Sequence, residues 1–155
     1  MESLESTEGR TLSPGGLRGK TFVIFYEDRS HTDDNQDLKE ACGRMVARGL
    51  FDGRFDVLGV AEVEGLGFAP VQAIVKRAVQ AIARRYGTEL YLDFHGALKK
   101  RPWSLGGHGS AVAIVDEEGE VIYRGFGRLD AREVDRFFAH LHEALQGETV
   151  RAACA

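Results

Sequence analysis

One stretch, residues 21–34, constrains the fold of this chain more than any other. It begins with a continuous apolar run (TFVIFY, residues 21–26), passes through a short polar link and enters an amphipathic segment near Asp34. Residues 22–26 are apolar without alternation, so both faces of this strand must be buried, as in a central parallel strand that is covered on each side. The stretch therefore predicts a strand–loop–helix junction inside an α/β domain.

The composition predicts one ordinary globular domain. At 155 residues the chain can bury roughly 68–70% of its unfolded surface, and its 43% apolar and 28% charged residues are typical of soluble proteins. The net charge of −4 gives no overall reason to expect nucleic acid or an anionic membrane as a partner. We expect a single domain over residues 12–147, a flexible arm over residues 1–11, and a frayed tail over residues 148–155 after a last helix that stops at Gly147.

Hydropathy, the N-terminal sequence and the cysteine content restrict further which class of protein this can be. No apolar run approaches the ~18 residues of a membrane span, and residues 1–20 lack the apolar core of a signal peptide. We therefore expect a cytoplasmic protein, or a periplasmic one if an export signal has been removed. With only Cys42 and Cys154, neither a disulfide framework nor a thiolate metal cluster is expected. We expect no bound cofactor.

The remaining periodic segments predict the order of elements. A helix over residues 34–50 leads to a second buried strand over residues 55–63, a unit that implies a right-handed crossover and a parallel pair. Short strands follow at residues 90–94, 111–115 and 120–124, the last two joined as an antiparallel hairpin. The predicted buried stripes of the three helices are Leu38, Ala41, Cys42, Met45 and Val46; Val71, Ile74, Val75, Ala78 and Ile82; and Val134, Phe137, Phe138, Leu141 and Leu145.

Two local motifs resemble those of the redoxin group of thioredoxin-like proteins. Residues 17–20 (LRGK) resemble the L-x-G-K sequence that precedes the first strand, and residues 113–121 (AIVDEEGEV) resemble the F-V-I-D-x-x-G-x-I hairpin. The resemblance covers roughly residues 12–146, and among relatives the chain is most similar to the YtfJ-type proteins. It implies an α/β, three-layer thioredoxin-like fold with a mixed central sheet and helices on both faces.

The chain departs from this family where the redox site would lie. The family's Cys-x-x-Cys pair falls on Ser30, His31, Thr32 and Asp33, and its cis-proline falls near Ser110. Thiol–disulfide exchange needs a thiolate, and a serine hydroxyl neither ionises near neutral pH nor forms a mixed disulfide. We therefore predict a fold kept for binding rather than for redox catalysis, and we lean against an enzyme.

The predicted binding surface joins the segment that replaces the redox motif to the strand facing it and to a basic loop. Tryptophan is enriched at binding hot spots, although Trp103 can equally serve to pack this loop onto the domain. Basic residues beside an aromatic can also contact phosphate, but in an acidic protein such a run is more often solvated. We expect a protein partner, and neither nucleic acid nor membrane. The candidate residues beyond the redox-motif segment are His108, Gly109, Ser110, Lys99, Lys100, Arg101 and Trp103.

Two alternative functions use other residues. Cys42 is the candidate thiol of a redoxin-like oxidoreductase or peroxidase, but its position on an apolar helical stripe is typical of a small buried side chain. His31, Asp33 and His108 are candidate metal ligands, since two imidazoles and a carboxylate suit zinc. At the helix start, Ser30 and Asp33 offer an anion site, whereas the simpler interpretation is that Asp33 or Asp34 caps the helix.

Overall fold

The apolar run identified in the sequence forms the centre of the sheet. The computed structural model describes the backbone of residues 3–154 and the side chains of residues 3–146. Strand β3 (Thr21–Glu27) lies between β4 (Phe55–Glu62), to which it is parallel, and β6 (Ser110–Val115), to which it is antiparallel. All side chains from Thr21 to Tyr26 are buried. The prediction of a strand buried on both faces is therefore confirmed.

Within residues 3–154, seven strands form one mixed sheet in the order β2-β1-β5-β4-β3-β6-β7. β4 and β5 are parallel, and β6 and β7 form the predicted antiparallel hairpin. The remaining strands are β1 (Leu4–Ser6), β2 (Thr11–Leu12), β5 (Leu90–Asp93) and β7 (Val121–Phe126). The helices are α1 (Gln36–Ala47), α2 (Val71–Tyr86) and α3 (Ala131–Cys154), with short 3-10 helices η1 (Pro14–Gly16), η2 (Leu50–Gly53) and η3 (Ala97–Lys99).

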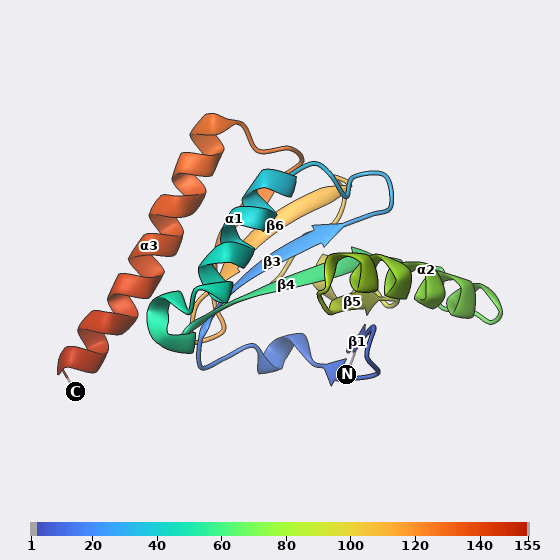
Figure 1. Cartoon of the computed structure of the whole chain (residues 1–155), viewed down its shortest axis with the longest axis horizontal. Coiled ribbons are helices and arrows are strands. Elements are labelled where there is room, and N and C mark those ends of the chain that lie inside the picture. Colours follow the sequence, from blue (N-terminus) through green and yellow to red (C-terminus); the bar gives the residue numbers. More distant parts are fainter. Residues whose placement is uncertain (1–2, 155) are drawn as a thin grey trace.

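The three α-helices cover one face of the sheet (Figure 1). β3, β4 and β5 follow one another across the sheet, and right-handed crossovers in one direction place both connecting helices on the same side. Phe25 of β3 shares a buried cluster with Leu38 of α1 and Phe137 of α3. Farther along the same face, Val79 of α2 packs in a cluster with Leu92 of β5.

The second face is covered by a layer with little regular helix. Ile24 and Tyr26 of β3 lie there in one cluster with Leu4, Leu17 and Trp103. These partners come from the N-terminal segment that contains η1 and from the loop that contains η3. The mixed sheet and the layer on each side agree with the expected fold, but 3-10 turns and extended chain replace α-helix in the second layer.

Both ends of the chain are more ordered than expected. Where a flexible arm is predicted over residues 1–11, the structure places Leu4–Ser6 in the sheet, antiparallel to β5, and Leu4 is fully buried. β1 thereby pairs with backbone N–H and C=O groups of β5, which would otherwise be an exposed edge strand. At the other end, α3 continues past Gly147 to Cys154. The side chain of Cys154 lies outside the described residues. Among the residues that the structure describes, no helix is long and apolar enough to cross a membrane.

The buried stripe of α2 differs from the one that the sequence predicts. Val75 packs against the core and Val79 and Ala83 are buried, but Ile74 and Ile82 are exposed. Residues spaced four apart shift gradually around a helix. The apolar residues of α2 are therefore spread widely enough that either of two helix faces could be the buried one. Packing against Ala61 and Leu92 decides between them, and it leaves Ile74, Ala78 and Ile82 on the outside.

Candidate functional site

The segment equivalent to the family's redox motif lies at the carboxyl end of β3, between that strand and α1. Two hydrogen bonds attach it to the start of β6. The backbone N–H of Asp28 donates to the carbonyl of Gly109 over 2.8 Å, and the hydroxyl of Ser110 donates to Asp34 Oδ2 over 2.7 Å. The two segments that the sequence analysis expected to face each other are therefore adjacent.

His31 is held in this loop by a neighbouring carboxylate. Its Nδ1 lies 2.6 Å from Asp28 Oδ1, and the same oxygen accepts the backbone N–H of Ser30 over 2.9 Å. The imidazole lies over Gly109, where a side-chain Cβ would collide with the ring and where φ is +76°. The contact therefore needs glycine at position 109. The hydrogen bond and charge of Asp28 raise the pKa of His31 above its ordinary value.

We expect the protonation of His31 to depend on Asp28. In Asp28→Asn, the pKa of His31 should fall toward its ordinary value of about 6.5, because the carboxylate that favours the imidazolium is gone. Since the pKa of the folded state is the raised one, the pair stabilises the fold below about pH 6.5, and this contribution disappears as the pH rises through the folded pKa. An NMR titration of the His31 ring measures the shift.

The control for this titration is Asp52→Asn, the same substitution at an exposed aspartate of η2. It should leave the titration of His31 unchanged. Identical titration curves for wild type and Asp28→Asn would contradict the assigned pair.

A largely buried carboxylate lies next to the same loop. Glu27, the last residue of β3, bonds through Oε1 to Lys39 Nζ of α1 over 2.7 Å, and that ammonium also donates to the carbonyl of Thr32. Glu27 Oε2 is buried with no hydrogen-bond partner among the described residues. Burial raises the pKa of Glu27, and the contact with Lys39 opposes that rise. Lys39 therefore links the loop, through Thr32, to the end of β3, through Glu27.

The sequence predicts that Asp33 or Asp34 caps the first turn of α1, but neither residue occupies the cap position. The cap position is Asn35, whose side chain makes no capping bond to the helix. Its amide instead donates to the carbonyl of Gly127 over 3.1 Å and accepts the backbone N–H of Leu129 over 3.0 Å. The side chain therefore joins the start of α1 to the segment before α3, a contact distant in sequence that propensity cannot reveal.

Cys42 lies away from this loop, in the core. Its side chain is fully buried in the cluster between the sheet, α1 and α3. Burial raises the pKa of its thiol to about 12. A thiol in this setting is a small apolar group rather than a nucleophile.

The predicted metal ligands do not form a site. Nδ1 of His31 is hydrogen-bonded to Asp28, and the ring of His108 packs against Phe126 with centroids 4.4 Å apart and a tilt of 40°. Within the part of the chain that the structure describes, no group of three His, Cys, Asp or Glu side chains is placed to hold a metal ion. The candidate ligands His31, Asp33 and His108 are therefore not brought together as a metal site among these residues.

The basic loop is part of the core on its inner side. Trp103 is only 7% exposed and belongs to the cluster on the second face of the sheet. Lys99 forms ion pairs with Glu62 at 2.8 Å and Glu64 at 3.2 Å. Of the predicted contact residues in this loop, Lys99, Lys100 and Arg101 are exposed. Trp103 thus packs the loop onto the domain and is not available as a surface anchor.

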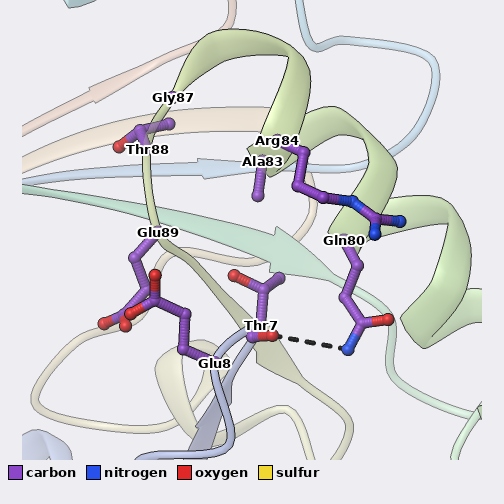
Figure 2. A pocket seen from close by; sticks show the side chains of 8 residues that line it. All are labelled: Thr7, Glu8, Gln80, Ala83, Arg84, Gly87, Thr88 and Glu89. Carbon is purple, nitrogen blue, oxygen red and sulfur yellow. Dashed lines mark hydrogen bonds between the residues drawn. The ribbon is translucent and has the colours of Figure 1, made fainter.

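A cavity of about 590 Å³ lies elsewhere, between the turn after β1 and the C-terminal end of α2 (Figure 2). This is the edge where β5 begins, opposite the edge where β3 ends. Its lining includes Glu8 and Glu89 on one side and Gln80, which donates to the carbonyl of Thr7, on the other. Arg10 pairs with both carboxylates. The cavity shares no residue with the loop around His31.

No protein-family profile and no curated protein sequence matches the chain, but solved structures match its fold. An uncharacterized thioredoxin-like protein from Porphyromonas gingivalis has a TM-score of 0.64 at 24% identity, covering 94% of this chain and 91% of that one. A thiol-disulfide isomerase from Corynebacterium glutamicum has a TM-score of 0.63 at 18% identity, covering 94% and 93%. A thiol:disulfide interchange protein of the thioredoxin family from Chlorobium tepidum TLS has a TM-score of 0.61 at 14% identity, covering 92% and 92%. The chain therefore has a thioredoxin-like fold.

Proposed function

We propose that this protein uses its thioredoxin-like fold to bind a protein partner and does not exchange disulfides. The surface proposed for binding, here called the β3–α1 surface, consists of Ser30, His31, Thr32, His108 and Phe126. The observation that carries the proposal is the chemistry at the junction of β3 and α1, where hydroxyl, imidazole and carboxylate groups stand and the one described cysteine is buried elsewhere.

Two of the structural neighbours are named for thiol–disulfide chemistry, and that chemistry depends on a thiolate. The attacking sulfur must be ionised and accessible to another disulfide. A thiol with a pKa of about 12 is ionised in roughly one molecule in 10⁵ at pH 7, and the Cys42 side chain is fully buried. The fold therefore resembles that of the neighbours, while the reactive group that their names imply has no accessible equivalent at this junction.

The β3–α1 surface has the character of a binding site. Phe126 is 38% exposed and packs against the ring of the exposed His108, which gives the surface an aromatic centre. Ser30 and Thr32 contribute exposed polar groups beside it. The loop is held by Asp28, Ser110 and Lys39 before any partner arrives. A surface ordered in advance loses less conformational entropy on binding.

A redox assay separates this proposal from the enzyme alternative. We expect the wild-type protein to reduce insulin disulfides no faster than the reductant alone, and Cys42→Ser to behave identically. The positive control is the double variant Ser30→Cys/Asp33→Cys, which places two thiols at the start of α1 and should gain measurable activity. Wild-type activity that disappears in Cys42→Ser would establish the oxidoreductase function instead.

A pull-down with matched variants tests the binding surface. We expect the wild-type protein to retain a specific partner that the double variant His108→Ala/Phe126→Ser loses, with a reduction of tenfold or more, because aromatic anchors dominate interface energies, at about 2 kcal/mol or more each. Leu50→Ser is the control, since Leu50 is a similarly exposed apolar residue on η2 at the other end of α1. A wild-type protein without a specific partner, or a partner kept by the double variant, would contradict the proposal.

A further inference from the structure

The exposed apolar side chains of this protein are concentrated in one segment that the β3–α1 surface does not include. Seven large apolar side chains are exposed among the described residues, and five of them lie between residues 66 and 86. Leu66 and Phe68 are in the loop that enters α2, and Ile74, Ile82 and Tyr86 are on the helix. The exposed fractions reach 59% for Phe68 and 63% for Ile74. Such a concentration marks an interaction site more often than isolated exposed residues do.

The same helix is strongly basic, although the chain as a whole has a net charge of −4. α2 contains four basic residues and no acidic one. Lys76 is paired with Glu5 at 2.6 Å, so the outward charge comes from Arg77, Arg84 and Arg85, all exposed. Arg84 extends away from the carboxylates of the neighbouring cavity (Figure 2).

The carboxylates near the two ends of α2 form ion pairs with other parts of the chain, which lower the negative charge there. Glu62 and Glu64 are bonded to Lys99 before the helix begins. After the helix ends, Glu89 is paired with Arg10. The outer side of α2 thus combines exposed isoleucines with a row of arginines, on a helix that lies at the opposite side of the molecule from α3 (Figure 1).

This combination restricts what can cover the helix. A second copy in a two-fold contact through α2 would bring the same arginines against each other. Nucleic acid would engage the arginines and leave Ile74, Ile82 and Phe68 in water. An anionic bilayer takes both kinds of group, since apolar side chains enter the boundary between headgroups and acyl chains while arginines contact lipid phosphates. A bilayer also fits a convex helix face without the complementary groove that a protein partner would have to supply.

We propose that the outer face of α2 docks this protein onto the surface of an anionic lipid bilayer. The contact is peripheral: the inner side of the helix stays packed on the sheet through Val79 and Ala83, and the apolar side chains of the outer side enter the headgroup region. Leu66 and Phe68 extend the contact at the start of the helix. This inference uses none of the residues of the β3–α1 surface, so either proposal can fail without the other.

Flotation with lipid vesicles tests the proposal. We expect the full-length protein to float with vesicles of equimolar phosphatidylcholine and phosphatidylglycerol and to stay behind with pure phosphatidylcholine. Binding should weaken strongly when the salt concentration rises from about 0.1 M to about 1 M, since screening shortens from about 10 Å to about 3 Å. Arg77→Gln/Arg85→Gln should bind roughly 30-fold more weakly, because each basic residue near an anionic surface contributes roughly fivefold.

Two further variants make the test specific. Ile74→Ser/Ile82→Ser should also lose binding. If the attraction were purely electrostatic, this variant would bind like the wild type. Arg128→Gln/Arg132→Gln removes the same charge from exposed positions outside α2 and should bind like the wild type. Circular dichroism of each variant confirms that the fold is intact. A wild-type protein that does not bind anionic vesicles overturns the proposal, and equal losses in all three variants overturn it too.

Discussion

Trp103→Ala is expected to lower the free energy of unfolding by about 3–5 kcal/mol, one of the two largest effects of a single substitution that we predict. The indole lies in the cluster with Ile24 and Tyr26, on the face of the sheet opposite α1, α2 and α3. Removing it would leave a cavity between the sheet and the loop around η3. For a chain of this length the loss corresponds to a fall in Tm of roughly 6–20 °C.

Denaturant unfolding and calorimetry measure this effect. Trp103→Phe keeps most of the apolar volume and should lose less than half as much stability. Arg101→Ala, at an exposed position in the same loop, should stay within about 0.5 kcal/mol of the wild type. If Trp103→Ala unfolds like the wild type but loses a binding partner, the side chain is a surface anchor and the packing described above is wrong.

Asp93→Ala is expected to lower stability by a similar amount, about 3–5 kcal/mol. The carboxylate is fully buried and accepts three hydrogen bonds: from the hydroxyl of Tyr26 over 2.8 Å, and from the backbone N–H groups of Ala97 and Leu98 over 2.8 and 3.0 Å. Alanine would leave all three donors buried without an acceptor. Each such donor costs about 1–3 kcal/mol, and their sum is reduced because the turn can rearrange.

A double-mutant cycle with Tyr26→Phe apportions this effect. Tyr26→Phe alone removes one donor and keeps the two backbone bonds, so it should lose only about 0.5–1.5 kcal/mol. Asp93→Ala should then cost less in the Tyr26→Phe background than in the wild type, since one unpaired donor is already absent. Additive losses would show that the hydroxyl and the carboxylate do not interact in solution.

The regular part of the fold follows from short-range patterns in the chain. Continuous apolar residues predict the central strand, because only burial on both faces suits such a run. The turn at residues 116–119 predicts the hairpin of β6 and β7, which the structure contains. β1 has only three residues, too few for a pattern, and its place beside β5 depends on an edge formed by residues far along the chain.

The candidate site was predictable in location but not in its contacts. The resemblance to the redoxin group indicates the loop around Ser30, and the apolar stripe of the first helix already suggests that Cys42 is buried. Asp28 and Lys39 were missed, because nothing in the local sequence says which carboxylate a histidine or lysine will meet. An acidic residue directly after an apolar strand, as at Glu27, is the one signal available in advance.

By itself the sequence determined the central strand, the order of the main elements and the absence of cysteine from the junction after β3, since these depend on residue type and local periodicity. Only the tertiary structure decided which side of α2 is buried, that Trp103 faces inward, and that His31 pairs with Asp28. Those outcomes depend on the packing of distant segments against one another, and packing selects among faces that periodicity leaves equivalent.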